Sequence, residues 1–201
     1  MTNQTERTKR HLKEALIEAV HDRGWSRVTV NKIVEEAGYH RATFYQYYHS
    51  RQEIADELRN DIRTQVQETT VNRYTLGAAI ESGEMHAGSF ELMHFIYEKR
   101  RWFELYTVSD TLPGIQHDLP EAIAEVLEQM FILAPHHHAD LNTAMYRRYI
   151  AHGTAGLVYD WINDGFDKDS DTMTLELIRI LRSFAKGFVI EKAEPESKRR
   201  G

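Results

Sequence analysis

The stretch TVNKIVEEAGYHRATFYQYY, residues 29–48, decides the fold of this chain. Thr29 suits the N-cap of a helix over residues 30–37, whose apolar side chains share one face: Val30, Ile33, Val34 and Ala37. Gly38 predicts the end of this helix. The next helix must fit before Ser50, because Ser50 and Glu53 have the spacing of a capping box that starts a helix reaching about Val71. Two helices and a glycine turn therefore occupy only about 20 residues.

This spacing is typical of a helix-turn-helix, which can place its second helix in the major groove of DNA. The second helix, residues 40–48, contains four aromatic side chains and no carboxylate. Phe44 and Tyr48 share a face that can pack inward, whereas Arg41 and Tyr45 share another. Arginine can form two hydrogen bonds to guanine, and hydroxyl groups can reach phosphates. The helix therefore suits both base recognition and contact with the DNA backbone.

The remaining sequence predicts an all-α fold of about nine helices. Only 4 of the 201 residues are proline, and no stretch sustains the alternation of a strand. We expect a three-helix head over residues 1–51, a larger helical bundle over residues 52–190 and a flexible tail over residues 191–201. Helices are predicted at residues 5–23, 30–37, 40–48, 50–71, 90–101, 102–109, 113–133, 140–163 and 170–184, and the pattern is weak over residues 72–89.

Composition limits the classes of protein that fit. The chain has no cysteine, which excludes disulfides and thiolate metal sites. Neither a signal peptide nor an apolar run of about 18 residues occurs, so we expect a cytoplasmic protein without a membrane partner. The net charge of -6 argues against a protein that coats nucleic acid through bulk positive charge. Residues 1–51, however, hold nine basic and six acidic residues against 16 and 25 in the rest, which indicates a basic head on an acidic body.

The head resembles the TetR-type (TetR/AcrR) transcriptional regulators. The resemblance lies in Thr29-Val30, Ile33-Val34, Ala37-Gly38, Arg41, Thr43-Phe44-Tyr45, Tyr47-Tyr48 and Ser50-Arg51. It implies an all-helical homodimer with one DNA-binding head per subunit and a variable domain for dimerisation and often for a small-molecule inducer. It also implies base contacts from His40, Arg41 and Ala42, and backbone contacts from Thr29, Thr43, Tyr45, Tyr47 and Arg51. His40 departs from the family, which commonly has a small N-capping residue there.

The C-terminal part is similar to the branch of this family that contains the activator of dihydroxyacetone kinase operons. The similar residues are Tyr146, Tyr149-Ile150, Gly153, Gly156-Leu157-Val158, Trp161-Ile162, Gly165-Phe166, Ser170 and Met173. This similarity supports the last two helices as the dimer interface. The residues themselves agree, because glycines allow helices to approach closely while apolar side chains become buried. The predicted interface comprises Tyr149, Gly153, Gly156, Leu157, Trp161, Leu177 and Leu181.

A small-molecule effector would need a mostly apolar pocket with few polar groups. The candidates are His94, Trp102, Tyr106 and Trp161, taken from the aromatic middle of the chain and from the penultimate helix. His94 shares a helical face with Phe90 and Tyr97, so a core histidine is the alternative to a pocket residue. The aromatic residues, likewise, fit either a core or a pocket wall.

A metal site and an enzyme are the alternatives to a regulator. The adjacent side chains of His136, His137 and His138 diverge, which argues against a metal site. Glu18 with His21, and Glu91 with His94, have the spacing of a di-iron bundle, but Glu18 and His21 point away from the core and two further inward glutamates cannot be identified. We therefore expect no catalytic residues, cofactor or metal.

The function predicted from the sequence is that of a DNA-binding transcriptional regulator. It would bind a double-stranded, palindromic operator as a homodimer through the helix at residues 40–48, under the control of a small-molecule effector or a partner protein. The rival reading is an interaction module that does not bind DNA.

Overall fold

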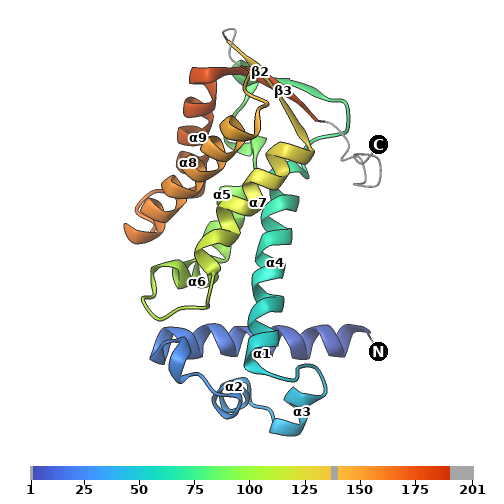
Figure 1. Cartoon of the computed structure of the whole chain (residues 1–201), viewed down its shortest axis with the longest axis vertical. Coiled ribbons are helices and arrows are strands. Elements are labelled where there is room, and N and C mark those ends of the chain that lie inside the picture. Colours follow the sequence, from blue (N-terminus) through green and yellow to red (C-terminus); the bar gives the residue numbers. More distant parts are fainter. Residues whose placement is uncertain (1, 137–139, 191–201) are drawn as a thin grey trace. The chain divides into compact units, whose positions relative to one another are not determined.

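The computed structural model describes residues 2–136 and 140–190. Within these residues the chain forms nine α-helices, four short 3-10 helices and three strands (Figure 1). The α-helices are α1 (Thr2–Arg23), α2 (Val30–Ala37), α3 (Arg41–Tyr45), α4 (Arg51–Val71), α5 (Leu92–Glu98), α6 (Arg100–Phe103), α7 (Ile115–Gln129), α8 (Ala144–Asn163) and α9 (Ser170–Phe184). The 3-10 helices are η1 (Trp25–Arg27), η2 (Ser82–Glu84), η3 (Ala87–Ser89) and η4 (Glu104–Thr107), and the strands are β1 (Ala79–Glu81), β2 (Phe131–Pro135) and β3 (Ala185–Ile190).

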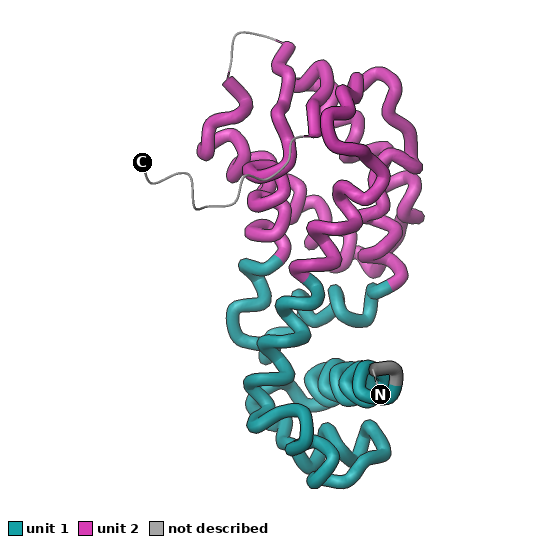
Figure 2. Tube along the Cα trace, turned by 90° about the vertical axis from the view of Figure 1, so that its right-hand side faces the viewer, with its two compact units in different colours: residues 1–62, 99–118 teal, residues 63–98, 119–201 magenta. Residues whose placement is uncertain are grey.

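The chain divides into two compact units, which Figure 2 shows in different colours. Unit 1 comprises residues 1–62 and 99–118, and unit 2 comprises residues 63–98 and 119–201. Both α4 and α7 contribute residues to each unit. The head predicted over residues 1–51 lies within unit 1, which also includes a segment about 50 residues further along the chain. The predicted tail, residues 191–201, lies outside the described part of the chain.

The helix boundaries of unit 1 follow from local chemistry. The Thr29 hydroxyl oxygen accepts a hydrogen bond from the Lys32 backbone N–H at 3.2 Å and so caps α2, as predicted. Gly38 ends α2 with a φ of 71°, a left-handed conformation that glycine adopts without a steric penalty. At the start of α4, the Ser50 hydroxyl accepts from the Glu53 N–H, while the Glu53 carboxylate accepts from the His49 N–H at 2.6 Å. The predicted capping box is therefore present with one difference. The Glu53 carboxylate accepts from the N–H of His49, one residue before the N–H of Ser50 that a capping box normally uses.

The core of unit 1 joins the first four helices. Its fully buried side chains come from α1, α2, α3 with the turn that follows it, and α4: Leu12, Leu16, Val20, Ile33, Phe44, Tyr48, Ile54 and Leu58. Burying a large apolar side chain stabilises a fold by about 1.5–3 kcal/mol, so this small core accounts for much of the unit's stability. The segment 99–118 is attached to α1 and η1 by polar groups. Arg101 pairs with Glu18 at 2.7 Å, and the Asp110 carbonyl accepts from the Trp25 N–H at 2.6 Å.

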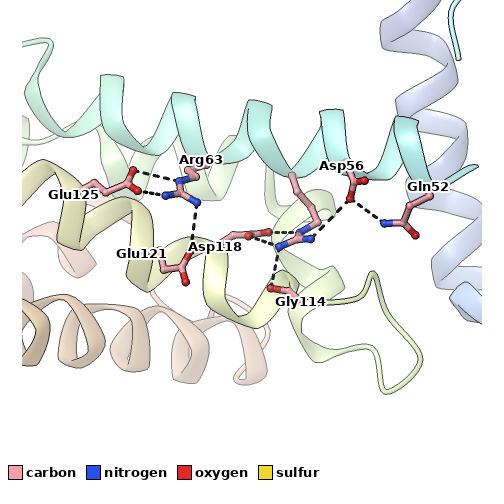
Figure 3. A network of polar contacts seen from close by, with 8 residues as sticks. Gln52, Asp56, Arg63, Gly114, Asp118, Glu121 and Glu125 are labelled. Atoms are coloured by element: carbon pink, nitrogen blue, oxygen red, sulfur yellow. Dashed lines mark hydrogen bonds and ion pairs between the residues drawn. The ribbon is translucent and has the colours of Figure 1, made fainter. Parts of the chain in front are cut away.

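Two arginines of α4 form ion pairs with carboxylates of α7 (Figure 3). In unit 1, the Nε and Nη2 atoms of Arg59 each donate to the Asp118 carboxylate at 2.7 Å, and Asp118 is buried. In unit 2, Arg63 pairs with Glu125 and, at 3.3 Å, with Glu121. Hydrogen bonding to Asp118 is the main cause that raises the pKa of Arg59 above its ordinary value. These pairs fix α7 beside α4 within each unit.

Unit 2 contains a three-stranded antiparallel sheet in the order β1-β3-β2. Phe188 of β3 pairs with Ile80 on one side and with Leu133 on the other. The Phe188 ring lies 4.7 Å from that of Phe131 and 5.5 Å from that of Tyr74, centroid to centroid. A side chain on Gly187 would collide with the Ile80 carbonyl group, so glycine is required there by the close approach of β1.

The sheet contradicts the prediction that the chain has no strands and that a helix covers residues 113–133. Here α7 ends at Gln129, and β2 begins at Phe131; in this strand Phe131 and Leu133 are buried and Ile132 is exposed. Three apolar residues are too few to distinguish a strand from the end of a helix. Their conformation is set by pairing with β3, which lies more than 50 residues away in the sequence.

Other boundaries differ by a few residues. The helix expected over residues 40–48 is regular only as α3, and the one expected to start at 140 begins at Ala144, where Thr143 caps it through the Tyr146 N–H. The helix expected over residues 170–184 is confirmed as α9. Among the helices of the described residues, none combines the length and apolar character needed to cross a membrane.

Candidate nucleic-acid interface

Helix α3 is fixed in unit 1 by two aromatic side chains. Phe44 and Tyr48 are fully buried, with ring centroids 5.6 Å apart, as their shared helical face predicted. The Tyr48 hydroxyl donates to the Glu57 carboxylate of α4 at 3.2 Å. Burial, together with the nearby carboxylates, raises the pKa of Tyr48 well above its ordinary value, so the phenol stays protonated. A helix of five residues is thus oriented by packing rather than by its own hydrogen bonds.

The neighbouring face of α3 is open to solvent. His40, Arg41, Ala42 and Tyr45 are exposed, whereas Thr43 and Tyr47 are half-buried. The Arg41 Nη2 atom donates to the Tyr45 hydroxyl at 3.0 Å, and the guanidinium carbon lies 5.4 Å from the centre of the Tyr45 ring. This contact spans one helical turn and leaves the other N–H groups of Arg41 directed to solvent. A cationic donor group is therefore displayed in a fixed position on a surface without carboxylates between residues 40 and 48.

Residues at the edges of α3 complete this surface. Thr29 is exposed, and its capping bond uses the hydroxyl as an acceptor, so the hydroxyl hydrogen remains able to donate. His40 is the N-cap of α3 but forms no side-chain capping bond. The His40 ring therefore does not cap the helix, whereas a small N-capping residue such as serine, which is common in the family, would do so.

Arg51 has an internal role that sequence reasoning missed. Its Nη1 atom donates to the backbone carbonyls of Trp25, at 2.7 Å, and of Val28. Its guanidinium carbon lies 4.4 Å from the centre of the buried Trp25 ring. The first residue of α4 therefore holds the connection between α1 and α2. The pairing of an arginine with an aromatic residue 26 positions earlier leaves no periodic signal in the sequence.

A polar cluster lies beneath Tyr48. The Lys13 ammonium group of α1 is nearly buried and pairs with Glu57 at 2.6 Å and with Asp61. Burial would lower the pKa of Lys13, but hydrogen bonds to these two carboxylates outweigh it and raise that pKa. Lys9 pairs with Glu57 at 3.0 Å. The cluster joins α1 to α4 and fixes the acceptor of the Tyr48 hydroxyl.

The four residues predicted for an effector pocket are divided between the units. Trp102 and Tyr106 belong to unit 1, where both are half-buried and Tyr106 stacks on Phe103 at 6.0 Å. His94 and Trp161 belong to unit 2. His94 is exposed and lies 3.3 Å from Glu98, so its ring is a surface group rather than a core histidine.

Trp161 is the buried member of this set. Its indole Nε1 donates to the Lys168 carbonyl at 2.9 Å, and its ring packs against Tyr97 and Phe166. A groove of about 230 Å³ passes over it between α8 and α9. Its lining combines apolar side chains, which include Leu157, Trp161 and Leu177, with charged ones: Asp160, Asp164, Asp167, Lys168 and Glu176.

The residues predicted for a dimer interface lie on α8 and α9. Tyr149 is 76% exposed and Gly153 is also exposed, whereas Gly156, Leu157, Leu177 and Leu181 are half-buried. Met145, one turn before Tyr149, is 81% exposed. Large apolar side chains this exposed, beside glycines, form a surface suited to another protein.

No group of three or more His, Asp or Glu side chains is arranged for a metal ion within residues 2–136 and 140–190. The His136 Nε2 atom lies 3.0 Å from the Arg182 carbonyl oxygen, and His137 and His138 lie outside the described residues. Both glutamates that have the di-iron spacing form ion pairs instead: Glu18 pairs with Arg101, and Glu91 pairs with Arg73.

Two family models match the chain. The model for bacterial regulatory proteins of the tetR family matches residues 13–58, and the model for a transcriptional regulator C-terminal region matches residues 83–183. A curated relative, the uncharacterized HTH-type transcriptional regulator YxbF of Bacillus subtilis (strain 168), is 22% identical over 161 residues, or 79% of this chain. The chain spans 40% of the length of that relative.

Solved structures are similar in fold at low identity. The dihydroxyacetone kinase operon activator DhaS has a TM-score of 0.61 and 13% identity, with 88% of this chain and 94% of that chain covered. A TetR family regulator from Marinobacter aquaeolei VT8 has a TM-score of 0.58 and 15% identity, with 92% and 100% covered. SmeT, the repressor of the Stenotrophomonas maltophilia multidrug efflux pump SmeDEF, has a TM-score of 0.55 and 14% identity, with 89% and 90% covered.

Proposed function

Because the chain belongs to the TetR family of bacterial regulatory proteins and is therefore a DNA-binding transcription regulator and not an enzyme, we propose that it binds a palindromic operator as a homodimer. Each subunit places α3 in a major groove. The DNA-binding function is assigned to residues 1–51, and dimerisation and control to residues 52–190.

The observation that carries this proposal is the contrast between the two faces of α3. Phe44 and Tyr48 fix one face in the core, whereas Arg41 and Tyr45 are paired on the exposed face. An arginine held in this way reaches DNA with little further loss of side-chain freedom. The bidentate contact that arginine forms with guanine suits the free edge of its guanidinium group.

The other residues of this surface take two roles. His40, Arg41 and Ala42, at the start of α3, are assigned to base edges. Thr29, Thr43, Tyr45 and Tyr47 are assigned to phosphates, since each bears a hydroxyl group that can donate to an oxygen anion. Arg51, which the family resemblance places at the backbone, acts here mainly by positioning the segment before α2, because its Nη1 atom and ring-facing surface contact Trp25 and Val28.

The dimer forms through α8 and α9. Tyr149 and Gly153 are exposed on α8, and a Cβ atom built on Gly153 or Gly156 has no neighbour within 4 Å outside its own stretch of helix. Two copies of α8 crossing near these glycines would approach closely and cover Tyr149. The groove lined by Leu157, Trp161 and Leu177 belongs to the same surface, so we assign it to the interface with a second copy.

Control by a small molecule or a partner protein is part of the proposal. Such an effector would act by changing the separation of the two heads in the dimer, which must match half-sites about 34 Å, or a multiple of that distance, apart. His94 and Trp161 of unit 2, and Trp102 and Tyr106 of unit 1, remain the proposed contacts for it.

The function is tested by selecting DNA from a random pool with the full-length protein. The proposal is supported by enrichment of a palindrome whose half-sites are one helical turn, or a multiple of one turn, apart, and by an affinity for it that falls steeply as salt is added. Enrichment of no sequence, with binding absent at low salt, contradicts it and favours an interaction module.

A further inference from the structure

A second polar surface of unit 1 lies outside the helix-turn-helix motif. A hollow of about 520 Å³ is lined by Gln4, Arg7 and Thr8 of α1 and by Tyr39 of the turn between α2 and α3. Residues 4, 7, 8 and 11 have the spacing that puts them on one face of a helix. The hollow therefore joins the N-terminal half of α1 to the residue that immediately precedes His40, the N-cap of α3.

Arg7 is the cationic group of this hollow. It is exposed, and among the ion pairs formed by the described residues none includes Arg7. The neighbouring cations of α1 are engaged, since Lys9 pairs with Glu57 at 3.0 Å and Arg10 lies 3.9 Å from Glu14. The side chains that line the hollow include no carboxylate. The hollow therefore offers a guanidinium group to an anion without a competing carboxylate in its lining.

Tyr39 is the second donor, and α1 holds it in place. Its hydroxyl lies 3.0 Å from the Nδ1 atom of His11, and the two rings stack with centroids 6.1 Å apart. When the proton of the imidazole is on Nδ1, His11 donates to the Tyr39 oxygen, and the phenolic hydrogen is left to donate outward. The hydroxyl and the Arg7 guanidinium group then face the same space.

We propose that the hollow of Arg7 and Tyr39 binds a phosphate of the operator backbone, with His11 as the residue that positions Tyr39. Guanidinium and phenol groups are among the common donors to DNA phosphates, and arginine matches phosphate oxygens with two parallel hydrogen bonds. The inference rests on the proposed function, because it extends the DNA footprint of α3 to a phosphate beside the start of that helix.

The test uses the full-length protein, the operator selected above and two single substitutions. The variant Arg7→Ala is expected to bind the operator about threefold to tenfold more weakly, and its slope of log affinity against log salt falls by about 0.9, the value for one lost phosphate contact. The variant Tyr39→Phe binds more weakly with an unchanged slope, because it loses a neutral donor. The matched control is Arg10→Ala, an exposed arginine of the same helix outside the hollow, which keeps the wild-type slope.

His11 is tested by a double-substitution cycle. The change His11→Ala lowers affinity in the wild-type background and adds nothing to Tyr39→Phe if it acts through the tyrosine. Additive effects contradict this positioning role. The inference as a whole is overturned if Arg7→Ala keeps both the wild-type affinity and slope while Arg41→Ala loses preference for the operator, a result that leaves the proposed function intact. Failure of the wild-type chain to prefer any DNA overturns both.

Discussion

The guanidinium carbon of Arg51 lies 4.4 Å from the centre of the Trp25 ring, and its Nη1 atom donates to the Trp25 carbonyl at 2.7 Å. The same nitrogen donates to the Val28 carbonyl. A single side chain at the start of α4 thus satisfies two carbonyls of the segment that leads into α2. The position of α2, and with it that of the turn before α3, depends on this arginine.

Replacing Arg51 by Gln is expected to lower the free energy of unfolding by about 2 kcal/mol, because two charge-assisted hydrogen bonds and a cation–π contact are lost. Urea denaturation measures the change. The control Arg27→Gln, an exposed arginine of η1, should leave stability within about 0.5 kcal/mol of wild type. An internal role also predicts an unchanged salt slope for operator binding, so a slope reduced by about 0.9 would show instead that Arg51 contacts a phosphate.

Acid sensitivity is predicted at Glu57, which accepts from Lys13, Lys9 and Tyr48. Burial alone would raise the pKa of Glu57, but hydrogen bonds from the two lysines outweigh it and hold the pKa below 4.5, its ordinary value. A carboxylate whose pKa is lower in the folded than in the unfolded state contributes its full stabilisation at a pH above its unfolded-state pKa. This contribution is lost as the pH falls through its folded-state pKa.

The variant Glu57→Gln should therefore be less stable than wild type at pH 7 by about 1–2 kcal/mol, and the difference should shrink as the pH falls below 4.5. Chemical denaturation at a series of pH values measures it. Glu14→Gln, in an exposed pair, is the control that should change little at any pH. A difference that stays constant down to acid pH contradicts the account.

Gly187 of β3 is predicted to tolerate no side chain. A methyl group there meets the Ile80 backbone carbonyl, so Gly187→Ala must displace β1 and should cost about 2 kcal/mol or more. The matched change Gly83→Ala, where no atom lies within 4 Å, should be nearly neutral. Thermal unfolding followed by circular dichroism compares the two variants, and equal midpoints would show that the sheet is not packed in this way.

The proposed dimer interface is tested by adding a large side chain at Gly153, on the exposed surface of α8. A Cβ atom at Gly153 meets nothing within 4 Å in one subunit, the position is exposed, and leucine has a higher helix propensity than glycine by about 0.8 kcal/mol. Gly153→Leu should therefore preserve folding and yet obstruct the crossing of two α8 helices. Light scattering is expected to give a monomer for this variant and a dimer for wild type and for Arg148→Leu, an exposed change on the same helix. A dimeric Gly153→Leu protein would place the interface elsewhere.

The features that the sequence predicts correctly are those that local chemistry decides. The Thr29 cap, the Gly38 turn and the inward face of Phe44 and Tyr48 are confirmed because each depends on neighbours within a few residues. The pairing of Arg41 with Tyr45 follows likewise from the helical period. The assignment to a family of regulators is confirmed by the two matching family models.

Features set by distant partners could not be read in this way. Strand β2 depends on β3, and the association of Asp110 with Ser26 joins segments 84 residues apart. The internal bonding of Arg51 depends on how the chain turns at Trp25 and Val28. The exposed position of His94 could not be distinguished from a buried one, because its apolar neighbours Phe90 and Met93 share its helical face. In each case residues that are distant in the sequence, rather than the local pattern, determine the conformation or the burial of the residue.

The central claim is that the exposed face of α3 reads DNA, and the affinity of Arg41→Ala for the selected operator tests it most directly. Loss of one arginine–base contact predicts binding weaker by about 10-fold to 100-fold at fixed salt, with relaxed preference at one base pair of each half-site. Circular dichroism should show an unchanged fold, since Arg41 is exposed. Wild-type affinity and base preference in Arg41→Ala would contradict the assignment of this face to DNA.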